Sequence, residues 1–181
     1  MQTPLPLSTR RLCLAVLDLV TPLAGPSSTA SAADITGQYT FKPIKIGGGG
    51  FVTGLVTHPT TANLTYCRTD VGGAFRWNAS DGGWVRLTTG SGMPAAFRVW
   101  QYYNVEAIAA DKLNDQIVYH AAGAQNPRSS VTPAGAIFKS TNRGATWTFA
   151  GTQRWKIAGN DDDREGGERL AVDPANSSVV Y

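Results

Sequence analysis

The chain has 181 residues, of which 42% are hydrophobic and 16% are charged, and its formal net charge at pH 7 is +3. Charges of both signs are nearly balanced and no basic stripe runs along the sequence, which argues against a nucleic-acid surface. Cys67 is the one cysteine beyond the first 32 residues. It has no intrachain disulfide partner there, so the fold must depend on core burial.

The first 32 residues have the layout of a secretory signal peptide. Arg10 and Arg11 precede a mostly apolar run, residues 12–23, and a small-residue cleavage site follows at residues 30–32. The apolar run is shorter than the roughly 20 residues that a membrane-spanning helix needs. We therefore predict a signal peptide at 1–32, a mature part at 33–181, secretion to the extracellular space and no membrane partner.

Short runs rich in Val, Ile, Tyr, Phe and Trp recur along the mature chain, and Gly, Asn, Asp or Pro bounds each run. This pattern is typical of strands joined by turns, so we predict an all-β fold. The runs also repeat, because two copies of four strands are followed by the start of a third. The predicted strands are residues 54–59, 64–66, 73–77 and 84–87, then 105–111, 116–119, 135–139 and 146–149, then 169–174 and 179–181.

Each copy spans roughly 50 residues, which is the size of a propeller blade. We predict blade 1 at about residues 51–89, blade 2 at about 105–150 and the start of blade 3 at about 168–181. A propeller ring closes with at least about four blades. About two and a half blades therefore indicate an incomplete propeller, the N-terminal part of a longer protein.

A second propeller signal lies in residues 140–147, which match the Asp-box pattern Ser-x-Asp/Asn-x-Gly-x-x-Trp through Ser140, Asn142, Gly144 and Trp147. The Asn side chain is expected to bond back to nearby backbone amides, the Gly to adopt positive φ, and the Trp to anchor the turn in the core. Residues 80–84 form a shortened version. We assign these motifs a structural role and no catalytic one.

No cofactor and no metal site is predicted. The glycine run 47–50 lacks the Gly-Lys-Ser/Thr of a phosphate-binding loop. His58 and His120 have no Cys, Asp or Glu at metal-ligand spacing. Glu168 and Arg169 are expected to pair with each other at the start of a strand.

Three sequons, at Asn63, Asn78 and Asn176, are glycosylation candidates if the protein passes through a eukaryotic secretory pathway. They are expected on exposed turns. Chance occurrence in a chain rich in Ser and Thr is the alternative.

The clearest chemical candidates are Arg68 and Asp70, in the stretch YCRTDVGGAFRW at residues 66–77. A turn between the second and third strands of a blade would place them on one face of the propeller, and Gly72 and Gly73 would allow a ligand or another backbone to come close. Asp70 is then a catalytic candidate. The alternative is a structural Arg–Asp pair that closes the turn.

The stretches GGGGFVTG at 47–54, HP at 58–59 and YCRTDVGGAFRW at 66–77 resemble the N-terminus of glycoside hydrolase family 74. This family contains xyloglucanases and reducing-end-specific xyloglucan cellobiohydrolases. The resemblance continues through residues 140–147 and 166–174, in the same order, and covers nearly the whole mature chain.

The resemblance implies two seven-bladed propellers with the glucan in the cleft between them. It implies that Asp70 is the general base for inverting attack of water on a β-1,4-glucosidic bond of xyloglucan, with Arg68 as its orienting partner. Inversion needs two carboxyl groups roughly 6.5–9.5 Å apart. The family's acid comes from the second propeller, so this chain alone is expected to be inactive, and it does not reveal whether cleavage is internal or at reducing ends.

Aromatic residues outside the repeat are the predicted sugar platforms, because sugar rings stack on exposed aromatic faces. They lie in the two linkers between copies: Trp100, Tyr102, Tyr103 and Trp155. One or two of them would instead fill gaps between blades. The resemblance adds Asn160 and Arg164 as cleft residues, although Asp163 departs from the glycine that the family usually has there.

Two other functions fit the same scaffold. A non-catalytic Asp-box propeller would bind carbohydrate or protein, or the chain would be a truncated inactive product. A sialidase-type hydrolase fits less well, because residues 97–99 only faintly match its arginine motif. A second propeller that supplies an acidic residue opposite Asp70 would distinguish the enzyme from the binding module.

Overall fold

The computed structural model describes residues 37, 47–124, 135–152, 157 and 168–181. The elements from residue 47 onward lie in one compact unit, Lys42–Tyr181, and consist of strands and three short 3₁₀ helices, with no α-helix among the described residues. The prediction of an all-β fold is therefore confirmed. The predicted signal peptide lies outside the described residues.

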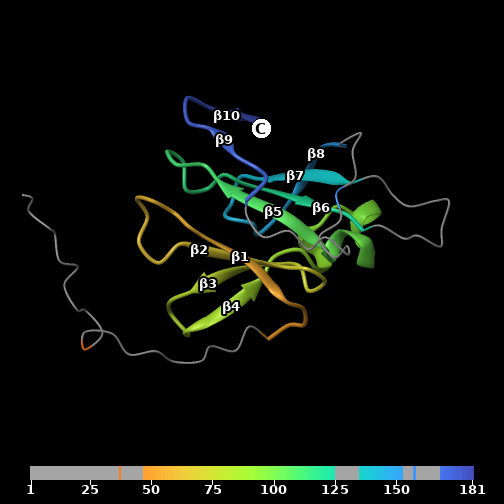
Figure 1. Cartoon of the computed structure of the whole chain (residues 1–181), viewed down its shortest axis with the longest axis horizontal. Helices are drawn as coiled ribbons and strands as arrows, with labels where there is room; N and C mark the ends of the chain where they lie inside the picture. The colour runs from red at the N-terminus through yellow and green to blue at the C-terminus, as the bar shows by residue number, and fades with distance from the viewer. Residues whose placement is uncertain (1–36, 38–46, 125–134, 153–156, 158–167) are drawn as a thin grey trace, which may run out of the picture. The chain divides into compact units, whose positions relative to one another are not determined.

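Two four-stranded antiparallel sheets and one strand pair make up the fold (Figure 1). In both larger sheets the strands follow one another in sequence order. The first sheet contains β1 (Val52–Thr57), β2 (Thr65–Thr69), β3 (Ala74–Asn78) and β4 (Gly83–Arg86). The second sheet contains β5 (Val105–Ala110), β6 (Val118–Ala122), β7 (Ala136–Ser140) and β8 (Thr148–Thr152). The pair is β9 (Val172–Asp173) and β10 (Asn176–Val180).

The two larger sheets repeat the same construction. Every strand predicted from the sequence overlaps one of the ten observed strands. The register between the first two strands of each sheet shifts near the start, between Val52 and Gly54 in one sheet and between Val105 and Ala107 in the other. Such a shift bends the strand locally and increases its twist.

The first and second sheets are joined by η2 (Gly90–Gly92), η3 (Ala95–Phe97) and η4 (Trp100–Tyr103). Arg98 fixes this connection, because its guanidinium donates to the carbonyls of Met93 at 2.8 Å and Ser91 at 3.3 Å. The linker is thus an ordered layer of 3₁₀ turns rather than an open loop.

The main core lies between the first two sheets. Tyr66 and Ala74 of the first sheet and Ile108 and Phe138 of the second are almost fully buried in one apolar cluster. Residues next to Ile108 face the other way, because side chains alternate across a strand. Ala107 and its neighbours on that face form a second cluster, which also contains Ile157 and Leu170.

His120 is buried within the main core. Its ring stacks on Phe138 with 4.8 Å between centroids, and Trp147 meets it edge-on at 4.3 Å. Neither ring nitrogen has a hydrogen-bond partner among the described residues. Burial lowers the pKa of His120 to about 3, so the ring is neutral at ordinary pH.

In the turn of the first hairpin of each sheet, one side chain accepts hydrogen bonds from the backbone amides two and three residues later. In the second sheet, Asp111 Oδ1 accepts from the backbone amides two and three residues later, at 2.7 and 3.0 Å. In the strand pair, Asp173 Oδ1 does the same at 2.8 and 3.0 Å. In the first sheet, His58 Nδ1 accepts from the amides of Thr60 and Thr61 at 3.3 and 3.0 Å.

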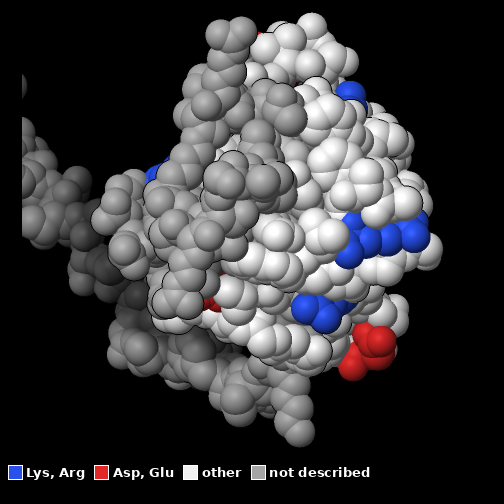
Figure 2. Space-filling model, turned by 90° about the vertical axis from the view of Figure 1, so that its right-hand side faces the viewer, with Lys and Arg blue, Asp and Glu red and all other residues white. Residues whose placement is uncertain are grey.

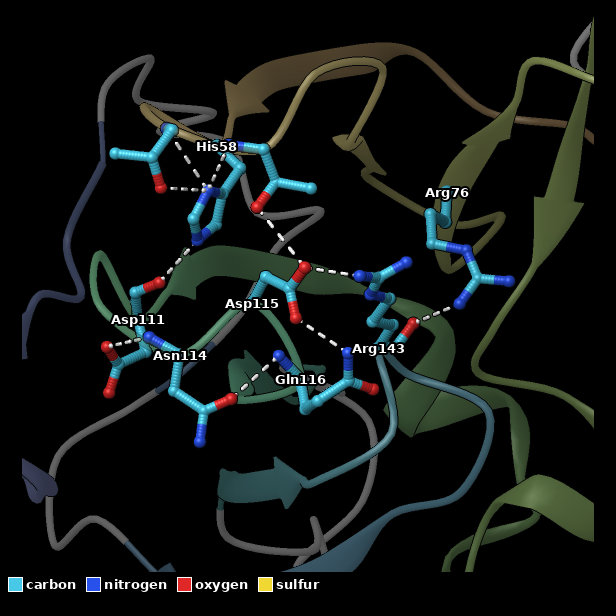
Figure 3. Close-up of polar contacts among 9 residues, drawn as sticks. His58, Arg76, Asp111, Asn114, Asp115, Gln116 and Arg143 are labelled. Atoms are coloured by element: carbon cyan, nitrogen blue, oxygen red, sulfur yellow. Dashed lines mark hydrogen bonds and ion pairs between the residues drawn. The ribbon is translucent and has the colours of Figure 1, made fainter.

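The His58 ring also connects the first two sheets (Figure 3). Because Nδ1 accepts, the proton lies on Nε2, which donates to the Asp111 carbonyl at 2.8 Å. Nearby, Asp115 accepts from Thr61 Oγ1 at 3.2 Å and pairs with Arg143. Hydrogen bonds, foremost that from Gln116, lower the pKa of Asp115.

Candidate active site

The corner between β2 and β3 holds the two charged residues that the sequence singled out. Thr69 closes this corner, because its amide and its hydroxyl both donate to the Gly73 carbonyl, at 3.0 and 2.9 Å, while the hydroxyl accepts from the Gly72 amide at 2.8 Å. Gly73 has φ of +96°, and a Cβ at Gly72 would lie 1.8 Å from the Gly49 carbonyl oxygen. The close approach expected at this Gly pair is thus made by the protein's own backbone.

Asp70 lies directly after β2, and its position is fixed by one neighbour. Its backbone amide donates to the Phe51 carbonyl at 3.1 Å, and its carboxylate oxygen Oδ1 accepts from the Phe51 amide at 2.7 Å. Gly50 makes room for this contact, because a Cβ there would lie 2.8 Å from Oδ1 and the residue has φ of +106°. The residue is 5% exposed.

Arg68 is buried and forms its ion pair with Glu168, which the sequence analysis did not select as a site residue. The guanidinium Nε lies 3.2 Å from Glu168 Oε1, and an NH₂ group donates to Thr53 Oγ1 at 2.8 Å. The carboxylate of Asp70 accepts from the Phe51 amide. The ion pair described for Arg68 is thus with Glu168, and the role of Arg68 as the orienting partner of Asp70 stays a prediction.

The ion pairs described for Glu168 and Arg169 are with other residues rather than with each other. Glu168 pairs with Arg68, whereas Arg169 donates to Glu106 Oε1 at 2.7 Å. Adjacent residues in an extended chain point to opposite sides, so each finds a partner on a different side of its segment. No sequence pattern marks the Arg68–Glu168 pair, because the two residues are 100 positions apart.

The predicted sugar platforms have different environments. Trp100 is 54% exposed, and Tyr103 is half-buried. Tyr102 is only 6% exposed and meets Phe97 and Phe138 edge-on in the core. It therefore presents no open face for a sugar, and its predicted platform role is wrong. Tyr102 is one of the gap-filling aromatics foreseen as the alternative.

Three predicted substrate-binding residues, Trp155, Asn160 and Arg164, lie outside the described residues. The sequons fall on turns or strand ends, with exposed side chains at Asn63 and Asn176 and a half-buried one at Asn78. Their glycosylation stays a prediction.

The turn of residues 140–147 makes the contacts expected of its side chains. Asn142 Oδ1 accepts from the Thr146 amide at 2.8 Å, and Gly144 has φ of +84°. Ser140 Oγ accepts from the amides of Asn142 and Gly144 at 3.2 and 2.8 Å. Trp147 is buried, and its indole donates to the Leu87 carbonyl at 3.0 Å. The turn is therefore a structural bridge to the first sheet.

One face of the described part of the molecule carries little charge. On the face in Figure 2 the described residues are mostly uncharged, with a few separate basic and acidic groups. Among the described residues there is no group of three or more His, Cys, Asp or Glu that could hold a metal ion. No helix within the part of the chain that the structure describes is long and apolar enough to cross a membrane.

Comparison with known proteins found similarity in both sequence and structure, although no family model matches the chain. A xyloglucanase of Hypocrea jecorina is 44% identical over 145 residues, which are 79% of this chain and 16% of that protein. A xyloglucanase of a Paenibacillus species is 38% identical over 157 residues, 86% of this chain and 14% of that protein.

The solved structure of a GH74 xyloglucanase from Xanthomonas campestris superposes with a TM-score of 0.60 and 40% identity, over 74% of this chain and 18% of that one. The chain thus spans less than a fifth of the length of these relatives. The resemblance expected from residues 47–77 is confirmed, and the chain is a homologue of the glycoside hydrolase family 74 xyloglucanases over the segment that it spans.

Proposed function

We propose that this chain is the N-terminal part of a secreted, inverting glycoside hydrolase that cleaves the β-1,4-glucan backbone of xyloglucan. The observation that carries the proposal is the position of Asp70 in the matched RTDVGG stretch. Its Oδ1 is fixed by the Phe51 amide, and its Oδ2 accepts no hydrogen bond from a described residue. A carboxylate held at one oxygen keeps the other available to a water molecule.

In this proposal the two larger sheets are propeller blades, the turn at residues 140–147 is an Asp-box, and a second propeller faces Asp70 across a cleft. Asp70 removes a proton from water while the water oxygen bonds to the anomeric carbon. The glucosidic C–O bond breaks, and an acid from the second propeller protonates the departing oxygen. The two carboxyl groups would stand roughly 6.5–9.5 Å apart, which leaves room for the water.

The substrate class is supported by two further features. Xyloglucan is an uncharged polysaccharide, and the described surface in Figure 2 is mostly uncharged. Trp100 exposes 54% of its surface on η4, where a sugar ring could stack. Tyr103 is half-buried on the same 3₁₀ helix and is a second platform.

A non-catalytic carbohydrate-binding propeller is the second candidate. The observation that favours it is the burial of Asp70, because a carboxylate that is 5% exposed and bonded to a backbone amide also fits a purely structural role. In that case the aromatic platforms would still bind glucan, and no bond would be cleaved.

Hydrolysis of xyloglucan by the full-length protein and by its Asp70→Asn variant separates these functions. Release of oligosaccharides whose new reducing ends are first α by NMR, with a loss of about 10³-fold or more in the variant, supports the inverting enzyme. Asp81→Asn is the matched control, because Asp81 is exposed in the β3–β4 turn. Glucan binding without hydrolysis by the unaltered protein would support the binding module instead.

A further inference from the structure

We infer that Asn63 and Asn176 carry N-linked glycans when the protein passes through a eukaryotic secretory pathway, and that these glycans lie at the end of the fold opposite to Asp70. Each residue begins an Asn-x-Ser/Thr triplet, which is the acceptor sequence for such glycans. The inference does not rest on the catalytic role of Asp70, because it concerns only where glycans are attached.

The first step is the direction of the strands in the first sheet. Its four strands are antiparallel and follow one another in sequence order, so successive turns alternate between the two ends of the sheet. The β2–β3 corner, which holds Asp70, lies at one end. The β1–β2 turn, which holds Asn63, lies at the other end (Figure 1). The β3–β4 turn lies at that other end too.

The second step is that the β9–β10 turn reaches the same end as the β1–β2 turn. The Ser177 carbonyl, next to Asn176, accepts from the Tyr119 hydroxyl at 2.6 Å. Tyr119 lies at the start of β6, directly after the β5–β6 turn. The Asp111 carbonyl of that turn accepts from His58 of the β1–β2 turn at 2.8 Å. A chain of contacts therefore joins the three turns, and the two sequons share one end of the fold.

The third step is that both acceptor amides are free to be modified. Asn63 and Asn176 are exposed, and the Nδ2 of neither residue donates a hydrogen bond to a described residue. Asn63 has φ of +61°, a backbone conformation that Asn adopts more readily than most other residues. Asn176 uses only its Oδ1, which accepts from the Ser178 amide at 3.0 Å.

The attachment reaction leaves these local contacts intact. Nδ2 forms a bond to C1 of the first sugar of a lipid-linked oligosaccharide, and the bond from C1 to the pyrophosphate oxygen breaks. The lipid pyrophosphate leaves, and the proton lost from Nδ2 goes to a base of the transferase. The carbonyl Oδ1 of the amide remains an acceptor, so the bond between Asn176 and the Ser178 amide is compatible with a glycan.

The third sequon has a less favourable environment. Asn78 is the last residue of β3, is half-buried and pairs with Gly83 of β4. Its neighbour Trp77 meets Trp84 edge-on, with 5.6 Å between the ring centroids. A bulky glycan has less room beside this aromatic pair than at the two exposed sites. We therefore expect lower occupancy at Asn78.

The position of the two exposed sites has a consequence for substrate access. Asp70 and the linker that carries Trp100 and Tyr103 lie at the end where β2 and β4 finish and β3 and β5 begin (Figure 1). Glycans on Asn63 and Asn176 extend from the opposite end. They should therefore leave the proposed substrate side of the chain open.

The test uses the full-length protein secreted from a eukaryotic host. Peptide N-glycosidase converts each glycosylated Asn to Asp, so peptide masses before and after treatment give the occupancy of each site. Thr65→Val and Ser178→Ala remove the hydroxyl that the acceptor sequence requires and keep both Asn residues, so each should abolish one glycan. Thr65→Ser and Ser178→Thr are the matched controls and should keep it, because they retain the hydroxyl.

We expect glycans on Asn63 and Asn176 in most molecules and a lower occupancy at Asn78. Removal of the glycans should change the dissociation constant for xyloglucan by less than about threefold, because they lie away from the substrate side. An unmodified Asn63 or Asn176, or a higher occupancy at Asn78 than at either, would overturn the attachment sites. A larger change in the dissociation constant would overturn their placement opposite to Asp70. Failure of both glycoforms to bind xyloglucan would contradict the proposed function and not the attachment sites, which the masses measure directly.

Discussion

Arg68 and Glu168 are 100 residues apart in the sequence, and their side chains form an ion pair with 3.2 Å between Nε and Oε1. The pair crosses β1 above Gly54, where the two charged groups occupy the space of a side chain. This contact ties the segment before β9 to the end of β2, next to Asp70.

A methyl group at Gly54 should disrupt this arrangement. We expect Gly54→Ala to lower the free energy of unfolding by about 1–3 kcal/mol, because overpacking at a tight contact has this cost. Urea unfolding measures the change. Gly83→Ala is the control, since a Cβ there meets nothing within 4 Å, and it should change stability by less than about 0.5 kcal/mol. An equal change in the free energy of unfolding of the two variants would contradict the close approach at Gly54.

Ser140 should carry much of the stability of the turn between β7 and β8. Its buried hydroxyl accepts from two backbone amides, at Asn142 and Gly144. Ser140→Ala leaves both amides without this acceptor and should cost about 1–3 kcal/mol. Thr141→Ala, at the exposed neighbouring position, should be nearly neutral. Thermal unfolding compares the two, and a smaller loss at Ser140 than at Thr141 would contradict the hydrogen bonding described.

The sequence predicted each strand that the structure describes, because strand runs and turn residues are local signals. It predicted the turn at residues 140–147 for the same reason. Two site features were not predictable in this way. The partner of Arg68 depends on a contact 100 positions away, and the burial of Tyr102 depends on aromatic packing against Phe97 and Phe138 across the linker. Tertiary packing determined both.

The residue that accepts the turn hydrogen bonds in the first hairpin of each sheet could not be recognised from residue type alone. The acceptor residue is Asp111 in the second sheet and Asp173 in the strand pair, whereas it is His58 in the first sheet. The three side chains are chemically different, yet each accepts from the amides two and three residues later. Both ring nitrogens of His58 are used, Nδ1 within the turn and Nε2 in the contact with the Asp111 carbonyl.

The shared turn geometry predicts how His58 responds to substitution. His58→Asn should retain an acceptor for the Thr60 and Thr61 amides and lose only the contact with the Asp111 carbonyl, at a cost of about 1 kcal/mol. His58→Ala should lose all three hydrogen bonds and cost about 2–4 kcal/mol. Urea unfolding of both variants measures the difference. Equal destabilisation would show that the amide contacts contribute nothing.

His120 should make stability depend on pH. Its pKa is about 3 in the folded chain because of burial, below the unfolded value of about 6.5. Between these values the unfolded chain binds a proton that the folded chain does not. The stability present above about pH 6.5 is therefore lost as pH falls toward 3, with a limiting slope of about 1.4 kcal/mol per pH unit.

Replacing His120 should remove that slope. Since neither ring nitrogen has a hydrogen-bond partner among the described residues, His120→Leu loses no polar contact seen there and should be close to neutral at pH 7. Urea unfolding at several pH values between 4 and 7 compares the variant with the unaltered protein. An unchanged pH dependence in the variant would contradict the assignment of the slope to His120.

The most direct test of the account is azide rescue of an Asp70→Ala variant of the full-length protein. Azide attacks without losing a proton, so it needs no general base, while the acid can still protonate the departing oxygen. We expect xyloglucan hydrolysis to fall about 10³-fold or more in the variant, and added azide to restore cleavage with an α-glycosyl azide as product. Hydrolysis at the unaltered rate without azide, or a β-glycosyl azide as the product, would contradict the assignment of Asp70 as the base of an inverting enzyme.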